Sequence, residues 1–585
     1  MKDISLLSYW DLPRHLKTCL LYLFIYPEDY KINCEELKWK WMAEGFLAPR
    51  WGRLDQVAEN CFNELVNRNM IQPVVEYDGS VEHCRVHDMV LDLIISLSDG
   101  ENFATVLNGR ICNSFPSKIR RLSMHYSCED HKEAVRAVTE TKLHVRSLTT
   151  FWLVKQIPCL VNFHALRMLD LRGCGWLENK HVKNIGSSRQ LRYLRIGRSK
   201  VTELPWEIGK LQHLTTLHLR GCDSALRLPP TVLQLQKLVR LFISQETRLP
   251  AGEFGSMQTL EALELSIWNT DNPIRFAEQL GHLTKLRKLN ISLSGKSVED
   301  CEIRLMELLV SSVSELGKCN LRYLHTDSAK LFMLLFWDPC STFLYLQDLA
   351  TIESVLYMVP KGMASLKNLL KLDIWVSEFD KDGLTCLMDM PSLAHLKLMV
   401  VKPMKEKLTI GSNGFKLLKV FHFIYIIVFC HLEDRLRLTF SAGAVPALRR
   451  LHLNFSPMEV ASDFLAVLGV EHFSSFAHLQ LDISCALAAA DWVEALESSV
   501  EKLIDLHPNR QIHVSRYGEH SVFAEERKRW DEVGLCCAFL IVHACKEMGK
   551  RKCLQRNAYE EEWKKNRQFQ NRGMSEEEEQ EARQE

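Results

Sequence analysis

The chain has 585 residues, and its 73 lysines and arginines are balanced by 73 aspartates and glutamates. This neutrality excludes a generally basic nucleic-acid-binding protein, and a composition of 46% hydrophobic and 25% charged residues excludes a disordered or collagen-like chain. The length is compatible with several domains or with one long array of repeats.

The cysteines and the apolar segments indicate the cellular compartment of the protein. None of the 19 cysteines forms a Cys-x-x-Cys motif, which argues against a zinc ribbon or a redox dithiol and favours a reducing environment. The N-terminus lacks the apolar stretch of a secretory signal. The most apolar run, residues 420–430, has about half the length of a membrane-spanning helix. We therefore expect a cytoplasmic protein with no membrane span.

Residues 1–98 predict a small, mostly helical domain. Apolar residues at helical spacing alternate with breakers, and Gly45 is well placed to cap the end of one helix. The expected elements, in order, are helices at 12–24, 33–44 and 54–67, strands at 71–75 and 84–87 joined across Asp78-Gly79, and a helix at 88–97. Three helices followed by a two-stranded hairpin indicate a winged-helix domain.

A repeat dominates the rest of the chain. The frame L-x-x-L-x-L-x-x-C/N begins at Leu166 and recurs after 25, 23, 24, 22 and 26 residues. Weaker copies follow it and precede it, beginning at Ile119, Val145, Leu321, Leu346, Leu369, Leu393, Leu418, Leu448 and Phe476. One copy cannot bury its own leucines, so copies stack into a solenoid of short parallel strands. The turn residues Cys174 and Cys222 are expected to have a structural role.

The predicted fold is an α/β leucine-rich-repeat solenoid preceded by the winged-helix domain. We place a linker at 99–118 and the repeats at 119–515, with the clearest copies at 166–295. An amphipathic helix at 491–506 and a strand at 511–514 are expected to end the array. Residues 516–585, which include a run of four glutamates, predict a charged and partly disordered tail.

The concave face of the solenoid is the candidate site. Strand positions between the leucines point into that face, where partners usually bind. In the first repeats these positions hold a column of arginines with aromatic residues between them: Arg172, Tyr193, Arg195, His218, Arg220, Arg240 and Phe242. The hypothesis is a surface for an acidic or aromatic partner, and the alternative is ordinary solvated charge. Trp375, in a later strand, is either an interface anchor or a packing residue.

No catalytic or metal-binding motif is recognised, so we expect neither an enzyme nor a metal site. Gly295-Lys296-Ser297 lacks the preceding glycine of a phosphate-binding P-loop. The second helix of the winged-helix domain could enter a DNA groove through Lys38 and Lys40, but its three glutamates and two tryptophans favour packing. We expect no nucleic-acid partner.

The stretches LSYWDLPRHLKTCLLYLFIYPEDYKI, LKWKWMAEGFL and CRVHDMVLDLI resemble the winged-helix part of plant NB-LRR (NLR) disease resistance proteins, most closely those of cereals. The resemblance covers about residues 1–515. It makes Val86-His87-Asp88 the counterpart of the family's Met-His-Asp motif, with valine replacing methionine. In the family this histidine contacts the β-phosphate of bound ADP. The family's P-loop core is not found in this chain, so His87 is expected to bind nucleotide only if such a core is supplied elsewhere, and otherwise to cap a helix.

The resemblance implies a function in plant innate immunity. The expected role is a protein-binding recognition or regulatory module, with no cofactor of its own although full-length relatives use ADP and ATP. Its partner would be a pathogen effector, a guarded host protein or the nucleotide-binding half of an NLR. The alternatives are a non-signalling scaffold or an inactive remnant of a resistance gene and, if the protein is longer, an ATP-hydrolysing receptor.

Overall fold

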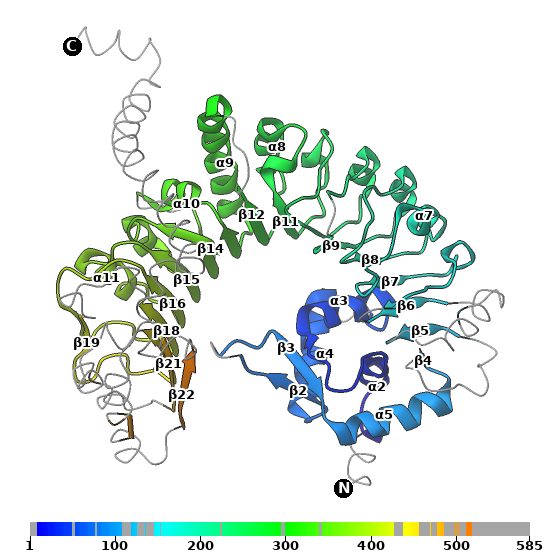
Figure 1. The fold of residues 1–585 in the computed structure, drawn as a ribbon, viewed down its shortest axis with the longest axis horizontal. Coiled ribbons are helices and arrows are strands. Elements are labelled where there is room, and N and C mark those ends of the chain that lie inside the picture. Colours follow the sequence, from blue (N-terminus) through cyan, green and yellow to red (C-terminus); the bar gives the residue numbers. More distant parts are fainter. Residues whose placement is uncertain are drawn as a thin grey trace, which may run out of the picture.

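The structure is a computed structural model, in which the chain forms a horseshoe with a small domain inside its arch (Figure 1). The residues that it describes are 9–48, 53–76, 79–107, 119–125, 135, 145–151, 154–222, 225–293, 299–338, 342–425, 437–455, 469, 477–484, 498, 500–501 and 511–517. The predicted helix at 491–506 and the predicted tail lie almost entirely outside these residues.

The small domain is a winged helix. Its elements are α2 (Arg14–Leu21), η1 (Tyr22–Ile25), β1 (Ile32–Asn33), α3 (Cys34–Glu44), α4 (Leu54–Asn67), β2 (Ile71–Val74), β3 (His83–Val86) and α5 (Asp88–Glu101). The Asn33 side chain caps α3 by accepting a hydrogen bond from the N–H of Glu36, and Gly45 ends the helix with φ +80°. The predicted hairpin is present, but β1 joins it to make a three-stranded sheet in the order β1-β3-β2.

The horseshoe is a ladder of parallel strands, one from each repeat. In order these are β4 (Thr105–Leu107), β5 (Arg121–Met124), β6 (Ser147–Thr150), β7 (Met168–Leu171), β8 (Tyr193–Ile196), β9 (Thr216–Leu219), β10 (Arg240–Ile243), β11 (Ala262–Ser266), β12 (Lys288–Ser292), β13 (Tyr323–Thr326), β14 (Asp348–Leu356), β15 (Lys371–Val376), β16 (His395–Val400), β18 (Val420–Tyr425), β20 (Arg450–Phe455), β21 (His478–Ser484) and β22 (Gln511–Tyr517). We call β4–β12 the first arm and β13–β22 the second arm. A separate pair, β17 (Leu408–Ile410) and β19 (Leu438–Phe440), lies outside the ladder.

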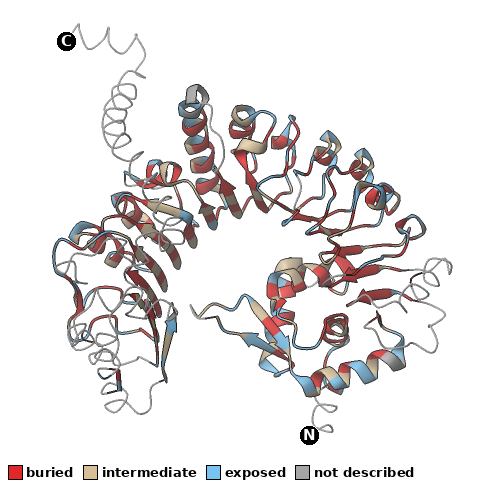
Figure 2. Ribbon diagram, in the orientation of Figure 1, coloured by how far each residue is buried: buried red, intermediate tan, exposed pale blue. Residues whose placement is uncertain are grey.

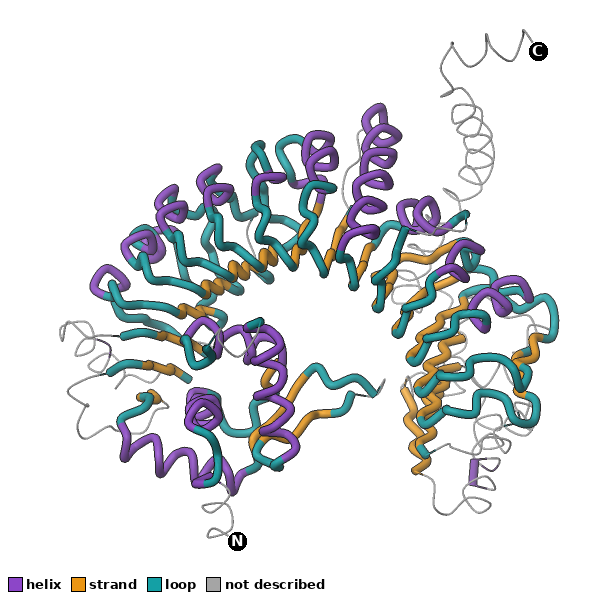
Figure 3. Tube along the Cα trace, turned by 180° about the vertical axis from the view of Figure 1, so that it is seen from behind, coloured by secondary structure: helices purple, strands orange, loops and turns teal. Residues whose placement is uncertain are grey.

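The convex side carries helical turns and helices, most of them short, seen on the outside of the arch in Figure 3. They are η3 (Leu160–Asn162), α7 (Asn179–Val182), η4 (Ile185–Ser187), η5 (Trp206–Lys210), η6 (Pro230–Gln234), η7 (Phe254–Ser256), η8 (Ile267–Asn269), α8 (Pro273–Leu280), α9 (Glu299–Cys319), α10 (Ala329–Phe336), η9 (Lys361–Ser365) and α11 (Lys381–Met388). The helical turns take up more room than the extended strands, so each repeat is wider on its outer side. The array therefore curves with its strands inside.

The predicted register of the repeats agrees with the ladder strands from β5 to β21, which exclude β17 and β19. Each of these strands starts two residues after the first residue of its copy, as in Leu166 followed by β7 and Phe476 followed by β21. The leucines at alternate strand positions form one continuous core along the array. The turn cysteines are structural, since the Cys174 thiol donates to Thr150 Oγ1 and the Cys222 thiol donates to the carbonyl of Ile196.

Part of the segment predicted as a linker belongs to the ladder. Residues 99–118 contain β4, which pairs in parallel with β5 and places Leu107 beside Met124. Three residues are too short for the repeat pattern to appear, so the sequence did not reveal this strand. The ladder therefore begins almost directly after α5, with no long spacer between the two domains.

The winged-helix domain lies against the concave face of the first arm (Figures 1 and 2). Its hydrophobic core continues into the ladder, because Phe151, Met168 and Tyr193 belong to the same buried cluster as Leu37 and Trp41 of α3. Phe151 meets the rings of Tyr26 and Tyr30 edge-on, with centroids 5.6 and 5.1 Å apart. The arginine-rich face predicted as a partner surface is thus largely covered by the chain itself.

Candidate functional site

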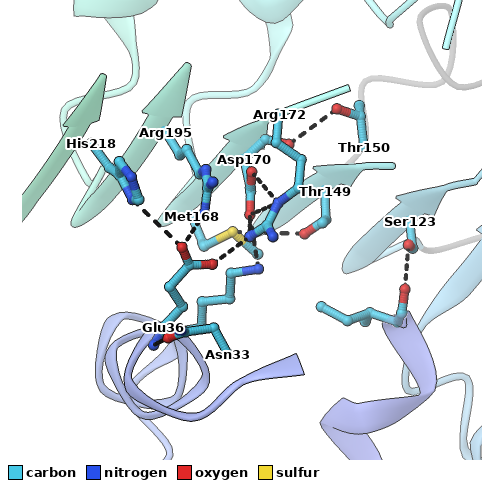
Figure 4. A network of polar contacts seen from close by, with 12 residues as sticks. Asn33, Glu36, Ser123, Thr149, Thr150, Met168, Asp170, Arg172, Arg195 and His218 are labelled. Atoms are coloured by element: carbon cyan, nitrogen blue, oxygen red, sulfur yellow. Dashed lines mark hydrogen bonds and ion pairs between the residues drawn. The ribbon is translucent and has the colours of Figure 1, made fainter. Parts of the chain in front are cut away.

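The candidate site is the interface between α3 and strands β7–β10, which we call the docking interface. The strands bring alternate residues to the concave face, and the 3.6-residue period of α3 brings Glu36, Trp39 and Lys40 to the opposing side. Figure 4 shows Glu36 directed at three side chains of the ladder, those of Arg172, Arg195 and His218.

Two sets of ion pairs join the centre of this interface. Lys40 Nζ lies 2.8 Å from Asp170 Oδ2, and both side chains are fully buried. Glu36 lies between two arginines, with its Oε2 2.9 Å from the Arg172 guanidinium and its Oε1 in contact with Arg195. Arg172 also binds Asp170 at 2.6 Å, so acidic and basic groups from both domains alternate in one network.

The network strongly lowers the pKa values of its acidic groups. Burial alone would raise the pKa of Glu36, but the positive charges of Arg172 and Arg195 outweigh it and lower the pKa to about 2. Burial likewise opposes ionisation of Asp170, yet Arg172 and Lys40 hold its pKa well below the usual range. Both carboxylates are therefore ionised at neutral pH.

The pKa values of Lys40 and His218 are lowered, in both cases mainly by burial. Burial is the largest influence on Lys40 and lowers its pKa to about 8, against the attraction of Asp170. Burial, with repulsion from Arg195, holds the pKa of His218 well below its ordinary value. His218 is therefore neutral at pH 7, and its Nδ1 lies 3.8 Å from Glu36 Oε1. Asp170, Glu36 and the two arginines carry the electrostatics of the interface.

Aromatic contacts extend the interface toward β10. The indole of Trp39 stacks on Phe242 with centroids 5.2 Å apart and planes 20° apart. The Arg240 guanidinium also lies over the indole, 5.2 Å from the Trp39 ring centroid. An arginine and a phenylalanine predicted on the concave face thus hold one tryptophan of the same chain.

Peripheral contacts surround this centre on both sides. On β5, Arg121 Nε donates to Glu44 at 3.2 Å, and the Ser123 hydroxyl donates to the carbonyl of Ile25 at 2.6 Å. Toward β12, Arg287 pairs with Asp55 of α4 at 3.3 Å. The winged-helix domain is therefore attached along most of the first arm.

The structure brings together most of the residues predicted for the concave face. Arg172, Arg195, His218, Arg240 and Phe242 contact the winged-helix domain, and Tyr193 is buried in the shared core.

Two of the predicted concave residues have other surroundings. Arg220 pairs with Glu264 of β11, a neighbour within the ladder, instead of with the winged-helix domain. Trp375 lies half-buried on the second arm, where its main-chain N–H donates to the Thr351 hydroxyl of β14 at 3.2 Å. Neither residue is part of the docking interface.

The winged-helix half of the site is not evident from the sequence. Glu36 and Lys40 are four residues apart on one helix face, and Asp170 lies between two core leucines of β7. A buried carboxylate between leucines was a usable signal, because it requires a cation nearby. Nothing in the sequence indicated that this cation comes from residue 40.

The residues considered for nucleotide or DNA binding have structural roles where the structure describes them. His87 is exposed at the N-terminus of α5, where its Nδ1 accepts a hydrogen bond from the N–H of Met89 at 3.3 Å. This is the capping role that the sequence offered as the alternative to a phosphate contact. Lys38 and Lys40, the basic residues of α3, are both buried in ion pairs. Gly295-Lys296-Ser297 lies outside the described residues.

The described residues contain no group of three or more His, Cys, Asp or Glu side chains placed to hold a metal ion. No helix within them is both long and apolar enough to cross a bilayer.

The fold and the docking interface define a leucine-rich-repeat protein that holds a winged-helix domain on the concave face of its own first repeats. Residues 25–94 match the family model of the disease resistance protein winged-helix domain, and residues 144–513 match that of a leucine-rich repeat region. The chain belongs to the plant NLR family of disease resistance proteins.

Curated relatives agree with this assignment. The chain is 30% identical over 524 residues to disease resistance protein RGA5 of rice, covering 87% of the chain and 45% of RGA5. It is 31% identical to disease resistance protein PIK6-NP of rice, covering 81% and 49%. A probable RPP8-like disease resistance protein of Arabidopsis thaliana is 28% identical, covering 77% and 49%. The chain thus spans about half the length of the curated relatives that it matches.

Solved structures of other repeat proteins are similar only in part. A leucine-rich-repeat protein of Leptospira interrogans covers 66% of the chain at 19% identity with a TM-score of 0.36, and the match includes 99% of that protein. An internalin of Listeria monocytogenes also covers 66%, at 14% identity with a TM-score of 0.35, and 90% of the internalin is included.

Proposed function

We propose that the chain acts in plant innate immunity, in defence against pathogens, as the protein-binding recognition and regulatory module of an NLR disease resistance protein. The supporting observation is the docking interface, in which Lys40 and Glu36 of α3 pair with Asp170, Arg172 and Arg195 of the ladder in a buried or mostly buried setting. A surface that holds a domain through several buried ion pairs is selective, because an unpaired charge there is costly. The interface is therefore suited to hold one defined arrangement of the two domains.

The two arms have different roles in this proposal. The first arm holds the winged-helix domain, and the second arm offers its concave side to a protein partner. That side carries partly exposed polar and aromatic residues, among them Lys371, Trp375 and Lys397. The partner is a pathogen effector or a guarded host protein, while the nucleotide-binding half of an NLR would meet the winged-helix domain. We place this activity in the cytoplasm.

In this proposal the residue of the chain that would contact a nucleotide is His87. Its ring is exposed beside the first turn of α5, so a phosphate group can approach it. ADP or ATP would be held there only together with a nucleotide-binding core, as the resemblance to NLR proteins suggests. The chain itself is proposed to bind proteins and not to catalyse a reaction.

The proposal is tested by disrupting the gene in its source plant and then restoring it in three forms. Wild-type protein should restore resistance to those isolates that grow more after disruption. A gene that carries Glu36→Arg should fail, because a third positive charge would face Arg172 and Arg195. The double change Glu36→Arg with Arg195→Glu should recover resistance in part. The readout is pathogen growth, with protein abundance measured in each line.

Two outcomes contradict the proposal. If no isolate grows more on the disrupted plant, the chain is better explained as a non-signalling scaffold or an inactive remnant. If Glu36→Arg restores resistance fully at normal abundance, the docking interface has no regulatory part in defence.

A further inference from the structure

The hairpin of the winged-helix domain reaches across the horseshoe to the second arm. Figures 1 and 3 both show the hairpin of β2 and β3 extending from the winged-helix domain toward the strands from β18 to β22. We call the described residues between β2 and β3, which are 75–76 and 79–82, the wing tip. At the wing tip, a methyl group built on Gly79 would come within 3.1 Å of Val420 Cγ2 and 3.2 Å of Arg450 Cδ. The main chain of Gly79 therefore lies directly on β18 and β20.

Glycine at this position satisfies two separate requirements. Its φ of +75° is unfavourable for other residues, and the closeness of Val420 and Arg450 leaves little room for a side chain. The turn is closed by two main-chain hydrogen bonds of 2.9 Å, from Gly79 N–H to Glu76 and from Glu76 N–H to Ser80. The wing tip is thus tied together on either side of the glycine that meets the second arm.

The receiving surface is formed by two paired residues. Val420 and Arg450 are neighbours in the ladder, each at the first position of its strand. Val420 is only 6% exposed although it lies on the concave face, whereas Lys371 and His395 at the same position of β15 and β16 are half-buried. The wing tip covers this valine.

Charge favours the same contact. The wing tip contains Glu76 and Glu82 and has no lysine or arginine. The edge that it meets contains Lys419, Arg449 and Arg450, of which the first two are exposed. A segment with two carboxylates and no basic side chain therefore approaches a basic strand edge at Gly79, and opposite charges of this kind favour attraction and orientation.

The wing tip is also connected to the docking interface. The N–H of Cys34, the first residue of α3, donates to the carbonyl of Glu82 at 2.9 Å. Beyond β3 the chain runs directly into His87, which caps α5. Short covalent and hydrogen-bonded paths thus connect the wing tip to the helix that carries Glu36 and Lys40.

We propose that the wing tip is a latch that docks on Val420 and Arg450 and joins the winged-helix domain to the second arm as well as to the first. This inference goes beyond the proposed function, since it concerns a contact within the chain and requires no particular ligand. A protein that binds the concave side of β18 and β20 has to displace the latch. Occupancy of the second arm is thereby sensed at α3 and at His87.

The test measures hydrogen–deuterium exchange in the purified full chain. Arg450→Glu places a negative charge against the acidic wing tip, and exchange in residues 75–84 should become at least about threefold faster. Lys371→Glu is the matched control, because it makes the same charge change at the same strand position without touching Gly79. Exchange in residues 75–84 should be unchanged in this control.

A second variant distinguishes loss of the wing-tip contact from damage to the ladder. If Arg450→Glu also speeds exchange within residues 450–455, Val420→Ala decides instead, because it removes contact area without adding charge. Faster exchange at the wing tip with unchanged exchange in β18 and β20 supports the latch. Unchanged exchange at the wing tip in Val420→Ala, or in Arg450→Glu with an intact ladder, overturns it.

Discussion

Asp170 lies at the centre of the docking interface. Its carboxylate lies between Lys40 of the winged-helix domain and Arg172 of its own repeat, and it has no exposed surface. A buried charge is tolerated only where opposite charges replace the water that it has lost. Asp170 therefore links the stability of the first arm to the presence of α3.

The first prediction concerns this carboxylate. Asp170→Asn should lower the free energy of unfolding by about 3–5 kcal/mol, because it leaves the buried Lys40 without its partner. Chemical denaturation of the full chain, followed by circular dichroism, measures the change. The control is Arg275→Gln, which breaks an exposed ion pair with Glu253 and should cost less than about 1 kcal/mol. Equal effects of the two substitutions would contradict the argument.

The second prediction concerns the stability of the fold at acidic pH. The pKa of Glu36 is about 2 in the folded chain against an ordinary value of 4.5, so its ionised form stabilises the fold above pH 4.5. This contribution should be lost as the pH falls from about 4.5 toward 2, in total on the order of 3 kcal/mol. Glu36→Gln has no such contribution to lose. The difference in Tm between wild type and Glu36→Gln should therefore shrink over this range, and a constant difference would refute the assignment.

At the scale of elements, the convex turns of the first arm stack with little free space. Gly186 of η4 lies so close to η5 that an added methyl group would overlap Glu207 Cβ and come within 2.7 Å of the Glu207 carbonyl oxygen. Strands and turns of neighbouring repeats are thus held at one spacing on both sides of the array. This spacing keeps successive strands in register, and with them the column of concave residues that receives α3.

The third prediction tests this packing. Gly186→Ala should lower the free energy of unfolding by about 1–3 kcal/mol, because the backbone of η5 cannot move away without shifting its repeat. Gly411→Ala is the matched control, since a methyl group there would meet no atom within 4 Å. Urea denaturation of both variants gives the comparison. A Gly186→Ala chain as stable as the control would show that neighbouring repeats adjust freely.

At the scale of the whole molecule, the winged-helix domain and the first arm share one core. Phe151, Met168 and Tyr193 are fully buried between them, so separation of the two would expose aromatic and apolar surface to water. A repeat array can otherwise unfold in parts, since each repeat contacts only its neighbours. The docked domain counteracts this tendency by bridging many repeats at once.

The fourth prediction follows from this bridging. The wild-type winged-helix domain and first arm should unfold in one calorimetric transition, whereas Glu36→Arg should add a separate transition at lower temperature. The cause is repulsion, because the guanidinium introduced at position 36 would face Arg172, Arg195 and Lys40. Lys361→Glu, on the exposed convex side, is the control and should keep the wild-type profile. A single unchanged transition in Glu36→Arg would contradict the coupling.

Much of this architecture could be predicted from local patterns. The repeat frame predicted the register of the strands from β5 to β21, because each leucine is needed by its own copy and the period repeats regardless of tertiary context. The helix α3 was predicted from its apolar spacing and from Gly45, which acts within one turn of the helix. The concave residues were predicted because strand alternation determines the face on which a side chain lies.

The solenoid, the winged helix and the row of arginines on the concave face thus follow from local sequence patterns. What that row binds does not, because it depends on contacts between distant parts of the chain. Glu36 and Arg195 are separated by 159 positions in the chain, and no period relates residues of different domains. The same holds for Gly79, which resembles an ordinary turn glycine until Val420 and Arg450 are seen beside it. Local spacing determines the face of a helix or strand on which a side chain lies. The residue that this side chain contacts depends on the tertiary fold of the whole chain.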